Sequence, residues 1–347
     1  MVAFIPQIAL LFLMIAIMEG SGYLARAAFL MDRVMGMAGL EGRAFVALLS
    51  SVACAIPGIM ATRTLPSAKD RIATMMGAPL MTCSARLPVY TLLIAMVVPG
   101  DLFWGPFQVQ GTIMFGLYLL GAVSAMIAAW VFKRIVGRGA TQLPFYMEMP
   151  SYRLPSARSV IIAVWDACKA FLRKVAGIIM VVTIVLWGLL NFPAPSEDAM
   201  TAAGVDVGDE AAVTAYTLDN SYAAAIGRAV SPVFDPLGFD WRINIGVISS
   251  LAARETVVST LGQVASAEDP EDPGESLEGM THSDGPHAGE PVFTPSTIAA
   301  LLVFFVYALQ CASTLGVMRR ETGTWRWPVV AFVYMGVVAW VMAFLGS

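Results

Sequence analysis

Three cysteines in apolar stretches are the residues of this sequence best suited to bind a metal ion. Cys54 lies in SSVACAIPGIMATR (50–63), Cys83 in MTCSA and Cys311 in LQCAS. Thiolate and thioether ligands select softer transition metals, whereas Mg²⁺ and Ca²⁺ prefer oxygen ligands. If the thiols converge, they predict a transition-metal site, with Met81 as a weaker candidate ligand. The alternative is that Cys54 packs as a small apolar side chain beside a proline kink.

Charged residues within apolar segments form a second candidate group. Glu19, Arg86 and the adjacent Arg254-Glu255 pair lie in such segments or at their edges. A charge at the centre of a membrane helix costs about 2.5–3.5 kcal/mol on insertion scales, so it usually faces a pathway or pairs with an opposite charge. Both interpretations stay open here: an ion path, or a structural ion pair such as Glu255 with Arg86.

Other residues narrow the range of functions. Both histidines, His282 and His287, lie in a polar acidic stretch, and we expect Cys168 in WDACKAF to be inert packing. The phosphate-binding motif G-x-x-x-x-G-K-[ST] is absent, and no basic cluster carries interleaved aromatic residues. We therefore expect no nucleotide site, no enzymatic activity and no nucleic-acid binding in this chain.

The composition is that of an integral membrane protein. Hydrophobic residues make up 58% of the 347 and charged residues 13%, with a mean hydropathy of +0.72. Soluble proteins have about 45–50% apolar and about 25% charged residues. Membrane helices need about 20 apolar residues, and we expect apolar segments at 4–24, 44–62, 73–98, 111–132, 175–192, 241–262, 296–317 and 327–345.

The distribution of Lys and Arg predicts the orientation of these segments. The basic connections 26–43, 63–71, 133–174 and 319–326 should be cytoplasmic by the positive-inside rule. The connections 97–111, 193–240 and 265–294 carry little or no basic charge and should lie outside. Segment 44–62 is then flanked by cytoplasmic connections and segment 241–262 by outside ones. Neither can cross once, so each should enter and return or break midway, with Pro57 and Gly58 supplying the first break.

The two odd segments also resemble each other. SSVAC (50–54) aligns with SSLAA (249–253), and each is followed by a cysteine-bearing span. We therefore predict an all-α, polytopic membrane fold of two inverted-topology repeats, 1–132 and 175–347, each with a broken or re-entrant segment. Residues 133–174 would be a cytoplasmic basic connection with an amphipathic helix.

Several motifs in order resemble the membrane domain of the ferrous iron transport protein B (FeoB) family. They are GSGYLARAAFLMDRVM (20–35), ACAIPGIMATRT (53–64), RIATMMGAPLMTCSARLPVY (71–90), MPSYRLPSARSV (149–160), SPVFDPLGFDW (231–241), SSLAARETVVSTLG (249–262) and QCASTLGVMRRETGTWRW (310–327). The resemblance implies Fe²⁺ import across the bacterial inner membrane through paired Gate segments. It implies Cys54, Cys83, Glu255 and Cys311 as the metal path, with Glu19 as a weaker candidate. The sequence departs from the family at Ala53, Gly20 and Arg254, where Gly, an acid and Lys are common.

The resemblance also implies partners. Family members usually begin with a GTP-binding domain and one further membrane helix, which this chain lacks, so we expect that domain on a separate chain or on a lost N-terminal part. Small cytoplasmic Feo-type accessory proteins and a homo-oligomer are further expected partners, besides the lipid bilayer. The alternative functions are a carrier of nucleosides or other organic solutes, and a membrane fragment that only docks partners.

Overall fold

The structure is a computed structural model that describes residues 4–100, 102–104, 107–136, 152, 154–193, 213, 216–218, 220–251, 254, 256–264, 277, 279–281, 291–309 and 311–347. Its contacts divide the chain into two compact units. Unit 1 comprises Met1–Ser84, Tyr118–Ile178 and Ser313–Ala331, and unit 2 comprises Ala85–Leu117, Ile179–Ala312 and Phe332–Ser347. Unit 1 thus contains the predicted odd segment 44–62, and unit 2 contains 241–262.

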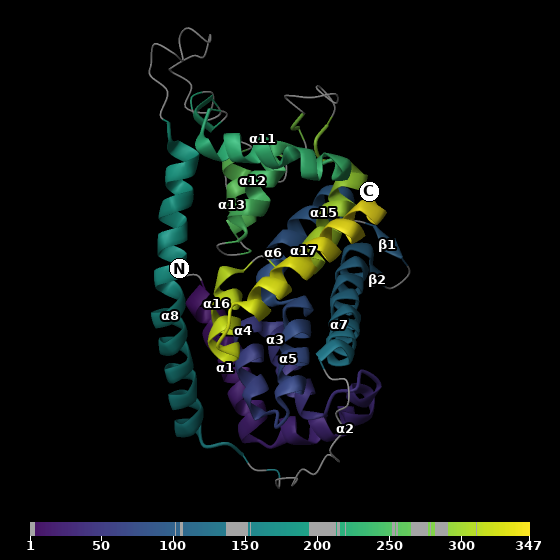
Figure 1. Ribbon diagram of the computed structural model, residues 1–347, viewed down its shortest axis with the longest axis vertical. Coiled ribbons are helices and arrows are strands. Elements are labelled where there is room, and N and C mark those ends of the chain that lie inside the picture. The colour runs from purple at the N-terminus through teal and green to yellow at the C-terminus, as the bar shows by residue number, and fades with distance from the viewer. Residues whose placement is uncertain are drawn as a thin grey trace. The chain divides into compact units, whose positions relative to one another are not determined.

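The described residues are mostly helical, which confirms the predicted class (Figure 1). Unit 1 is built from α1 (Phe4–Gly20), α2 (Tyr23–Met37), α3 (Arg43–Ala53), α4 (Ala55–Ala61), η1 (Thr62–Thr64), α5 (Ala68–Gly77), η2 (Ala78–Leu80) and α16 (Ala312–Thr322). Unit 2 is built from α6 (Leu87–Val97), β1 (Phe103–Trp104), β2 (Phe107–Gln108), α11 (Tyr222–Phe234), η4 (Asp235–Leu237), α12 (Trp241–Ser249), α13 (Thr256–Val264) and α15 (Pro295–Tyr307). The strands β1 and β2 are an antiparallel pair of two residues each.

Three long helices contribute residues to both units. They are α7 (Val109–Val136), α8 (Ala157–Asn191) and α17 (Arg326–Gly346). The units are defined by contacts rather than by sequence ranges, and the assignment of 1–132 and 175–347 to two repeats stays a prediction.

Several helices are long and apolar enough to cross a membrane. Among the described residues they are Ala68–Val97, Val109–Val136, Pro295–Thr322 and Arg326–Gly346. A fifth span would be the pair Phe12–Gly20 and Tyr23–Met37, which is bent by 85°. Within the expected apolar segment 4–24, α1 ends at Gly20, and the left-handed Gly22 (φ 79°) starts α2 in a new direction.

Two further elements differ from the sequence-based expectation. The expected span 175–192 and the amphipathic stretch before it form one helix, α8, of 35 residues. Its length of about 52 Å, at 1.5 Å per residue, exceeds the ~30 Å hydrocarbon core of a bilayer. In the connection 193–240 that we expected to be a loop, residues 222–234 form α11, which begins with the Ser221 hydroxyl accepting a hydrogen bond from the Ala224 N–H.

The exposed surface of α17 is that of a lipid-facing helix. Val329, Val333, Val337 and Val341 are 43–57% exposed and recur every four residues. The opposite stripe is fully buried and consists of Ala331, Met335, Ala339 and Ala343. Three of the four buried residues are alanines, and small buried residues on one face with exposed apolar residues on the other are typical of packed membrane helices.

Each unit has its own buried core. In unit 1 the core includes Leu48, Ile59, Met75 and Met76, contributed by α3, α4 and α5, which lie side by side (Figure 1). In unit 2 the rings of Phe234 and Phe239 are stacked, with centroids 6.0 Å apart, and Phe304 meets both edge-on. Such pairs contribute about 0.5–1.5 kcal/mol beyond area burial.

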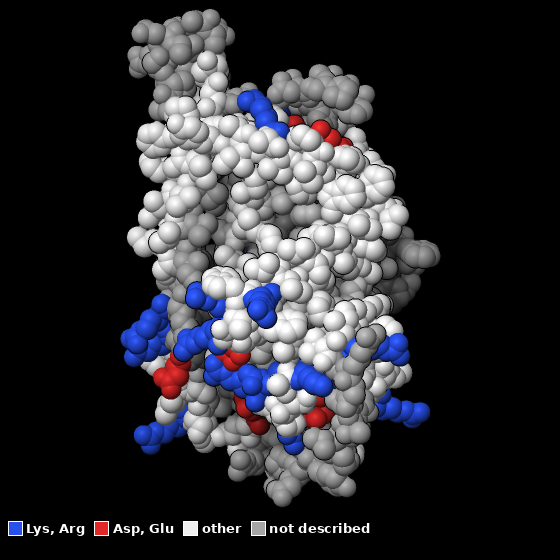
Figure 2. Space-filling model, in the orientation of Figure 1, with Lys and Arg blue, Asp and Glu red and all other residues white. Residues whose placement is uncertain are grey.

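All four connections that we predicted to be cytoplasmic are linked within unit 1. Lys133 forms an ion pair with Asp70 (2.8 Å) and donates to the Gly39 carbonyl, joining 133–174, 63–71 and 26–43. Arg63 donates from Nε to Glu321 Oε2 at 2.7 Å, which joins 63–71 to 319–326. Figure 2 shows Lys and Arg gathered over α2, α16 and the N-terminal half of α8. These links support the grouping of the four connections, and their cytoplasmic location stays a prediction.

Candidate functional site

The first broken segment is a hairpin of two helices with Cys54 at its tip. α3 ends at Ala53, Cys54 has an extended backbone (φ −156°, ψ 136°), and α4 begins at Ala55. Gly58 in α4 lies so close to α3 that a Cβ there would be 2.7 Å from the Ala47 carbonyl oxygen. A continuous helix would separate these two residues by about 16 Å. α4 therefore turns back along α3, which confirms the predicted interruption of residues 44–62.

The break occurs three residues earlier than we predicted, for a steric reason. Pro57 and Gly58 both lie inside α4 rather than at the break. A proline ring clashes with the carbonyl group four residues before it and offers that carbonyl no N–H donor. For Pro57 this carbonyl belongs to Ala53, where α3 ends. Pro57 thus ends α3 four residues before its own position, while Gly58 permits the close contact between α3 and α4.

Cys83 lies in a second break, and a hydrogen bond links the two breaks. Cys83 is buried between η2 and η3 (Ser84–Arg86), within the membrane-length segment Ala68–Val97. The Ser84 hydroxyl donates to the Ala53 carbonyl oxygen at 3.0 Å, the acceptor that Pro57 leaves without a helical donor. Ala53 precedes Cys54 and Ser84 follows Cys83, so this bond holds the two cysteine-bearing breaks together.

The wall of the break at Cys83 is supplied by α7. A Cβ on Gly121 of α7 would lie 3.1 Å from the Leu80 carbonyl oxygen and still closer to the Thr82 hydroxyl. The Thr82 hydroxyl is buried and has no hydrogen-bond partner among the described residues. A buried polar group without a partner costs about 1–3 kcal/mol, so this oxygen is available to a bound ion or water next to Cys83.

The second broken segment is also a hairpin. α12 ends at Ser249 and α13 begins at Thr256, whose hydroxyl donates to the Ser249 carbonyl oxygen at 3.0 Å. A Cβ on Gly246 would lie 3.3 Å from Leu261 Cδ2, although a continuous helix would separate these residues by about 22 Å. α13 therefore turns back along α12, and the predicted interruption of 241–262 is confirmed.

Cys311 occupies the break that adjoins this second hairpin. It is half-buried between α15 and α16. The Ala312 N–H donates to the Leu251 carbonyl oxygen at 2.9 Å, and Arg254 Nη2 donates to the Ala308 carbonyl oxygen at 3.3 Å. In both hairpins, then, the tip is hydrogen-bonded to the interrupted, cysteine-bearing span that follows.

The hairpins also close at equivalent positions. The alignment of SSVAC with SSLAA places Ala47 opposite Gly246 and Gly58 opposite Val257. Gly58 contacts Ala47, and a Cβ on Gly246 would lie 3.8 Å from Val257 Cγ1. Each hairpin therefore has one glycine at the same contact, on opposite arms. This agreement supports an internal repeat, whereas its inverted orientation stays a prediction.

The other predicted site residues lie in different parts of the structure. Arg254 is 5% exposed, and Arg86 is fully buried where α6 begins. Glu19 is exposed near the end of α1, and Met81 is half-buried. Glu255 lies outside the described residues. No three His, Cys, Asp or Glu side chains of the described part are gathered closely enough to hold a metal ion. The full predicted ligand set therefore remains a prediction.

The structural role of Ser84 is not evident from its place beside Cys83 in the sequence. We expect Ser84→Ala to lower the free energy of unfolding by about 1–3 kcal/mol, because it leaves the Ala53 carbonyl without its donor. Ser84→Thr keeps a hydroxyl and should lose much less. Thermal unfolding of the purified variants in detergent measures the difference, and equal melting temperatures for Ser84→Ala and the unchanged protein would contradict the role.

These features define a polytopic helical membrane protein whose sites are built from discontinuous helices, an architecture common among secondary transporters. The model of the Gate family, described as "Nucleoside recognition", matches residues 1–97 and 172–325. The model described as "Ferrous iron transport protein B C terminus" matches residues 114–166. The chain belongs to the Gate family, within the ferrous iron transport protein B (FeoB) group.

Curated relatives from several organisms have names that contain "Fe(2+) transporter FeoB". A protein of Leptospira biflexa named Fe(2+) transporter FeoB is 42% identical over 99% of this chain and 48% of its own length. A Fe(2+) transport protein A/Fe(2+) transporter FeoB fusion protein of Porphyromonas gingivalis is 36% identical over 99% of this chain and 42% of its own length. The chain thus spans about half the length of these relatives. The comparison with solved structures found no match.

Proposed function

We propose that this chain forms the membrane pathway of a ferrous iron importer in the bacterial inner membrane, and that Cys54 and Cys83 bind Fe²⁺ on its way. The observation that carries the proposal is the Ser84–Ala53 hydrogen bond, which joins the two breaks that hold these thiols. An ion that leaves water needs replacement ligands, and thiolates suit a transition metal. Interrupted membrane helices add unpaired backbone carbonyls to such a site. Relatives named Fe(2+) transporter FeoB support Fe²⁺ as the substrate.

We place Cys311 and Glu255 in a second set of ligands along the same pathway. Cys311 adjoins the second hairpin as Cys83 adjoins the first, which supports an equivalent role. Thr82 supplies a further oxygen beside Cys83. Met81 and Glu19 are weaker candidates, Glu19 because its side chain is exposed.

The partner of the pathway in this proposal is a GTP-binding domain. The FeoB relatives are about twice as long as this chain, which leaves room for such a domain in a whole protein of this kind. Any GTP hydrolysis would reside there, so this chain itself would not be an enzyme. A small accessory protein is a second expected partner, because the P. gingivalis relative is named as a fusion with Fe(2+) transport protein A.

A carrier of organic solutes is the second candidate function. It is favoured by the description of the Gate family as "Nucleoside recognition". The described parts of the two hairpin tips offer sulfur, hydroxyl and guanidinium groups, whereas a nucleobase site needs converging amide and aromatic groups.

Uptake into liposomes tests the two candidates against each other. The chain is reconstituted with and without the GTP-binding domain, and radioactive Fe²⁺ kept reduced by ascorbate is offered beside a labelled nucleoside. We expect iron to accumulate above protein-free liposomes and the nucleoside not to. Accumulation of the nucleoside, with iron at the protein-free level, would establish the second function instead.

A further inference from the structure

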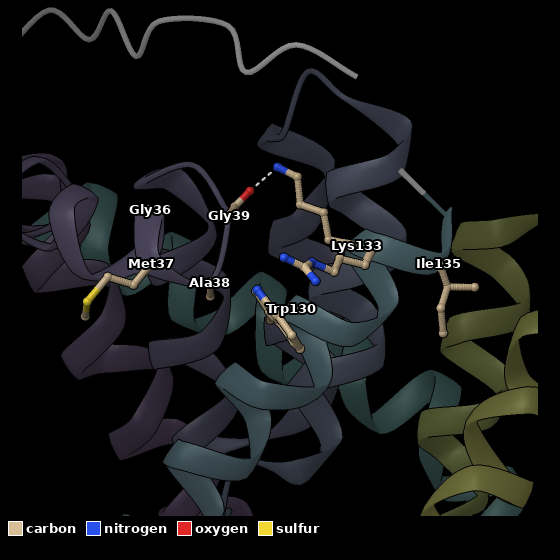
Figure 3. A pocket seen from close by; sticks show the side chains of 8 residues that line it. Gly36, Met37, Ala38, Gly39, Trp130, Lys133 and Ile135 are labelled. Atoms are coloured by element: carbon tan, nitrogen blue, oxygen red, sulfur yellow. Dashed lines mark hydrogen bonds between the residues drawn. The ribbon is translucent and has the colours of Figure 1, made fainter. Parts of the chain in front are cut away.

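A cavity of about 790 Å³ lies between the end of α2 and the end of α7 in unit 1. Its lining comprises Gly36, Met37, Ala38, Gly39, Trp130, Lys133, Arg134 and Ile135. Figure 3 shows Trp130 and Lys133 extending from α7 towards the end of α2, with Lys133 bonded to Gly39. The cavity takes no part in the proposed iron pathway, whose cysteines lie on other elements.

Two basic side chains line the cavity, Lys133 and Arg134, and one of them is available to bind an anion. Lys133 is neutralised by Asp70 at 2.8 Å and also donates to the Gly39 carbonyl. Arg134 is exposed, and its guanidinium carbon lies 4.4 Å from the centre of the Trp130 ring. None of the acidic residues in the described part forms an ion pair with Arg134. A guanidinium over an aromatic ring can still direct N–H donors to the oxygens of a phosphate.

The position of the cavity indicates where such an anion would come from. α7 is long and apolar enough to span a membrane, and Lys133 and Arg134 lie in its last turn. Met37 and Ile135 at the cavity are 74% and 67% exposed, as residues in contact with lipid tails would be. Tryptophan and arginine at the end of a membrane helix lie at the level of the lipid headgroups. Basic pockets between membrane helices on the cytoplasmic side bind anionic headgroups.

We propose that this cavity binds the phosphate headgroup of an anionic phospholipid, with Arg134 as the charged ligand and Trp130 as its platform. The recognised chemistry is a phosphate anion next to acyl chains. The apolar rim of Met37 and Ile135 favours a lipid over free phosphate as its source.

Native mass spectrometry of the full chain tests this proposal by titration with phosphatidylglycerol, phosphatidylcholine or inorganic phosphate. We expect the unchanged protein to retain phosphatidylglycerol in preference to phosphatidylcholine, and Arg134→Gln to weaken phosphatidylglycerol binding about fivefold. Arg134→Lys keeps the charge and should retain most of the binding. Arg320→Gln is the matched control, because it removes the same charge from an exposed position of α16 outside the cavity.

Three outcomes would overturn the assignment. Equal loss in Arg134→Gln and Arg320→Gln would show only diffuse attraction to basic residues. Equal retention of phosphatidylglycerol and phosphatidylcholine would show that the cavity does not select an anionic headgroup. Arg134-dependent binding of inorganic phosphate without a preference for phosphatidylglycerol would identify free phosphate as the ligand. Because Arg134 is exposed, the variants should fold, and their elution as single species checks this.

Discussion

Gly58→Ala should destabilise the first hairpin by about 1–3 kcal/mol or more, the usual cost of overpacking. The added Cβ would lie 2.7 Å from the Ala47 carbonyl oxygen and 2.8 Å from Ser51 Cβ, and neither atom belongs to a flexible side-chain end. Elsewhere in a helix the same substitution stabilises by about 1 kcal/mol, so the expected sign is opposite to that of ordinary propensity. Thermal unfolding in detergent measures the change.

Two other glycines provide matched controls. Gly336→Ala in α17 has nothing within 4 Å of the new Cβ and should be neutral or slightly stabilising. Gly246→Ala meets Leu261 Cδ2 at 3.3 Å, a mobile end that can shift, and should cost less than Gly58→Ala. A melting temperature of Gly58→Ala equal to that of Gly336→Ala would rule out the close contact between α3 and α4.

Cys54→Ser and Cys83→Ser should each reduce Fe²⁺ uptake about tenfold or more at limiting iron. A hydroxyl is a much poorer ligand than a thiolate for a transition metal, and loss of even an outer-shell contact typically costs 10–100-fold in affinity. Both substitutions nearly conserve volume, so the breaks and the Ser84–Ala53 hydrogen bond should persist. Uptake of radioactive Fe²⁺ into proteoliposomes gives the measurement.

Cys168→Ser is the control for these variants. Cys168 lies in the long helix α8, which forms neither of the two breaks, and its substitution should leave uptake unchanged. Normal uptake in the Cys54→Ser, Cys83→Ser double variant would eliminate the thiols as ligands. Loss of uptake in Cys168→Ser as well would point to general damage by serine rather than to a site.

The sequence predicted the interrupted segments well, because charge and hydropathy act over whole segments. The basic residues predicted that the connections 26–43, 63–71, 133–174 and 319–326 lie on one side of the membrane. Contacts of Lys133 and Glu321 link these connections in unit 1. That grouping alone required 44–62 to return to the side from which it entered. Pro57 predicted that the segment is interrupted but not where, because a proline acts on the carbonyl group four residues earlier.

The sequence could not reveal contacts that depend on tertiary packing. Ser84 is a common polar residue, and its role follows only from the approach of η3 to the tip of the first hairpin. The glycine contacts at Gly58 and Gly246 became visible as equivalent only when each hairpin was seen to close. The length of α8 was also missed, because its amphipathic first half and apolar second half have different patterns although the helix is continuous.

X-ray absorption at the iron edge tests the central claim most directly, with one equivalent of Fe²⁺ bound to the purified protein under reducing conditions. Two thiols on linked breaks predict sulfur atoms around iron at the ~2.3 Å typical of metal–thiolate bonds, and their loss in the Cys54→Ser, Cys83→Ser double variant. Iron surrounded by oxygen and nitrogen alone in the unchanged protein would contradict the claim.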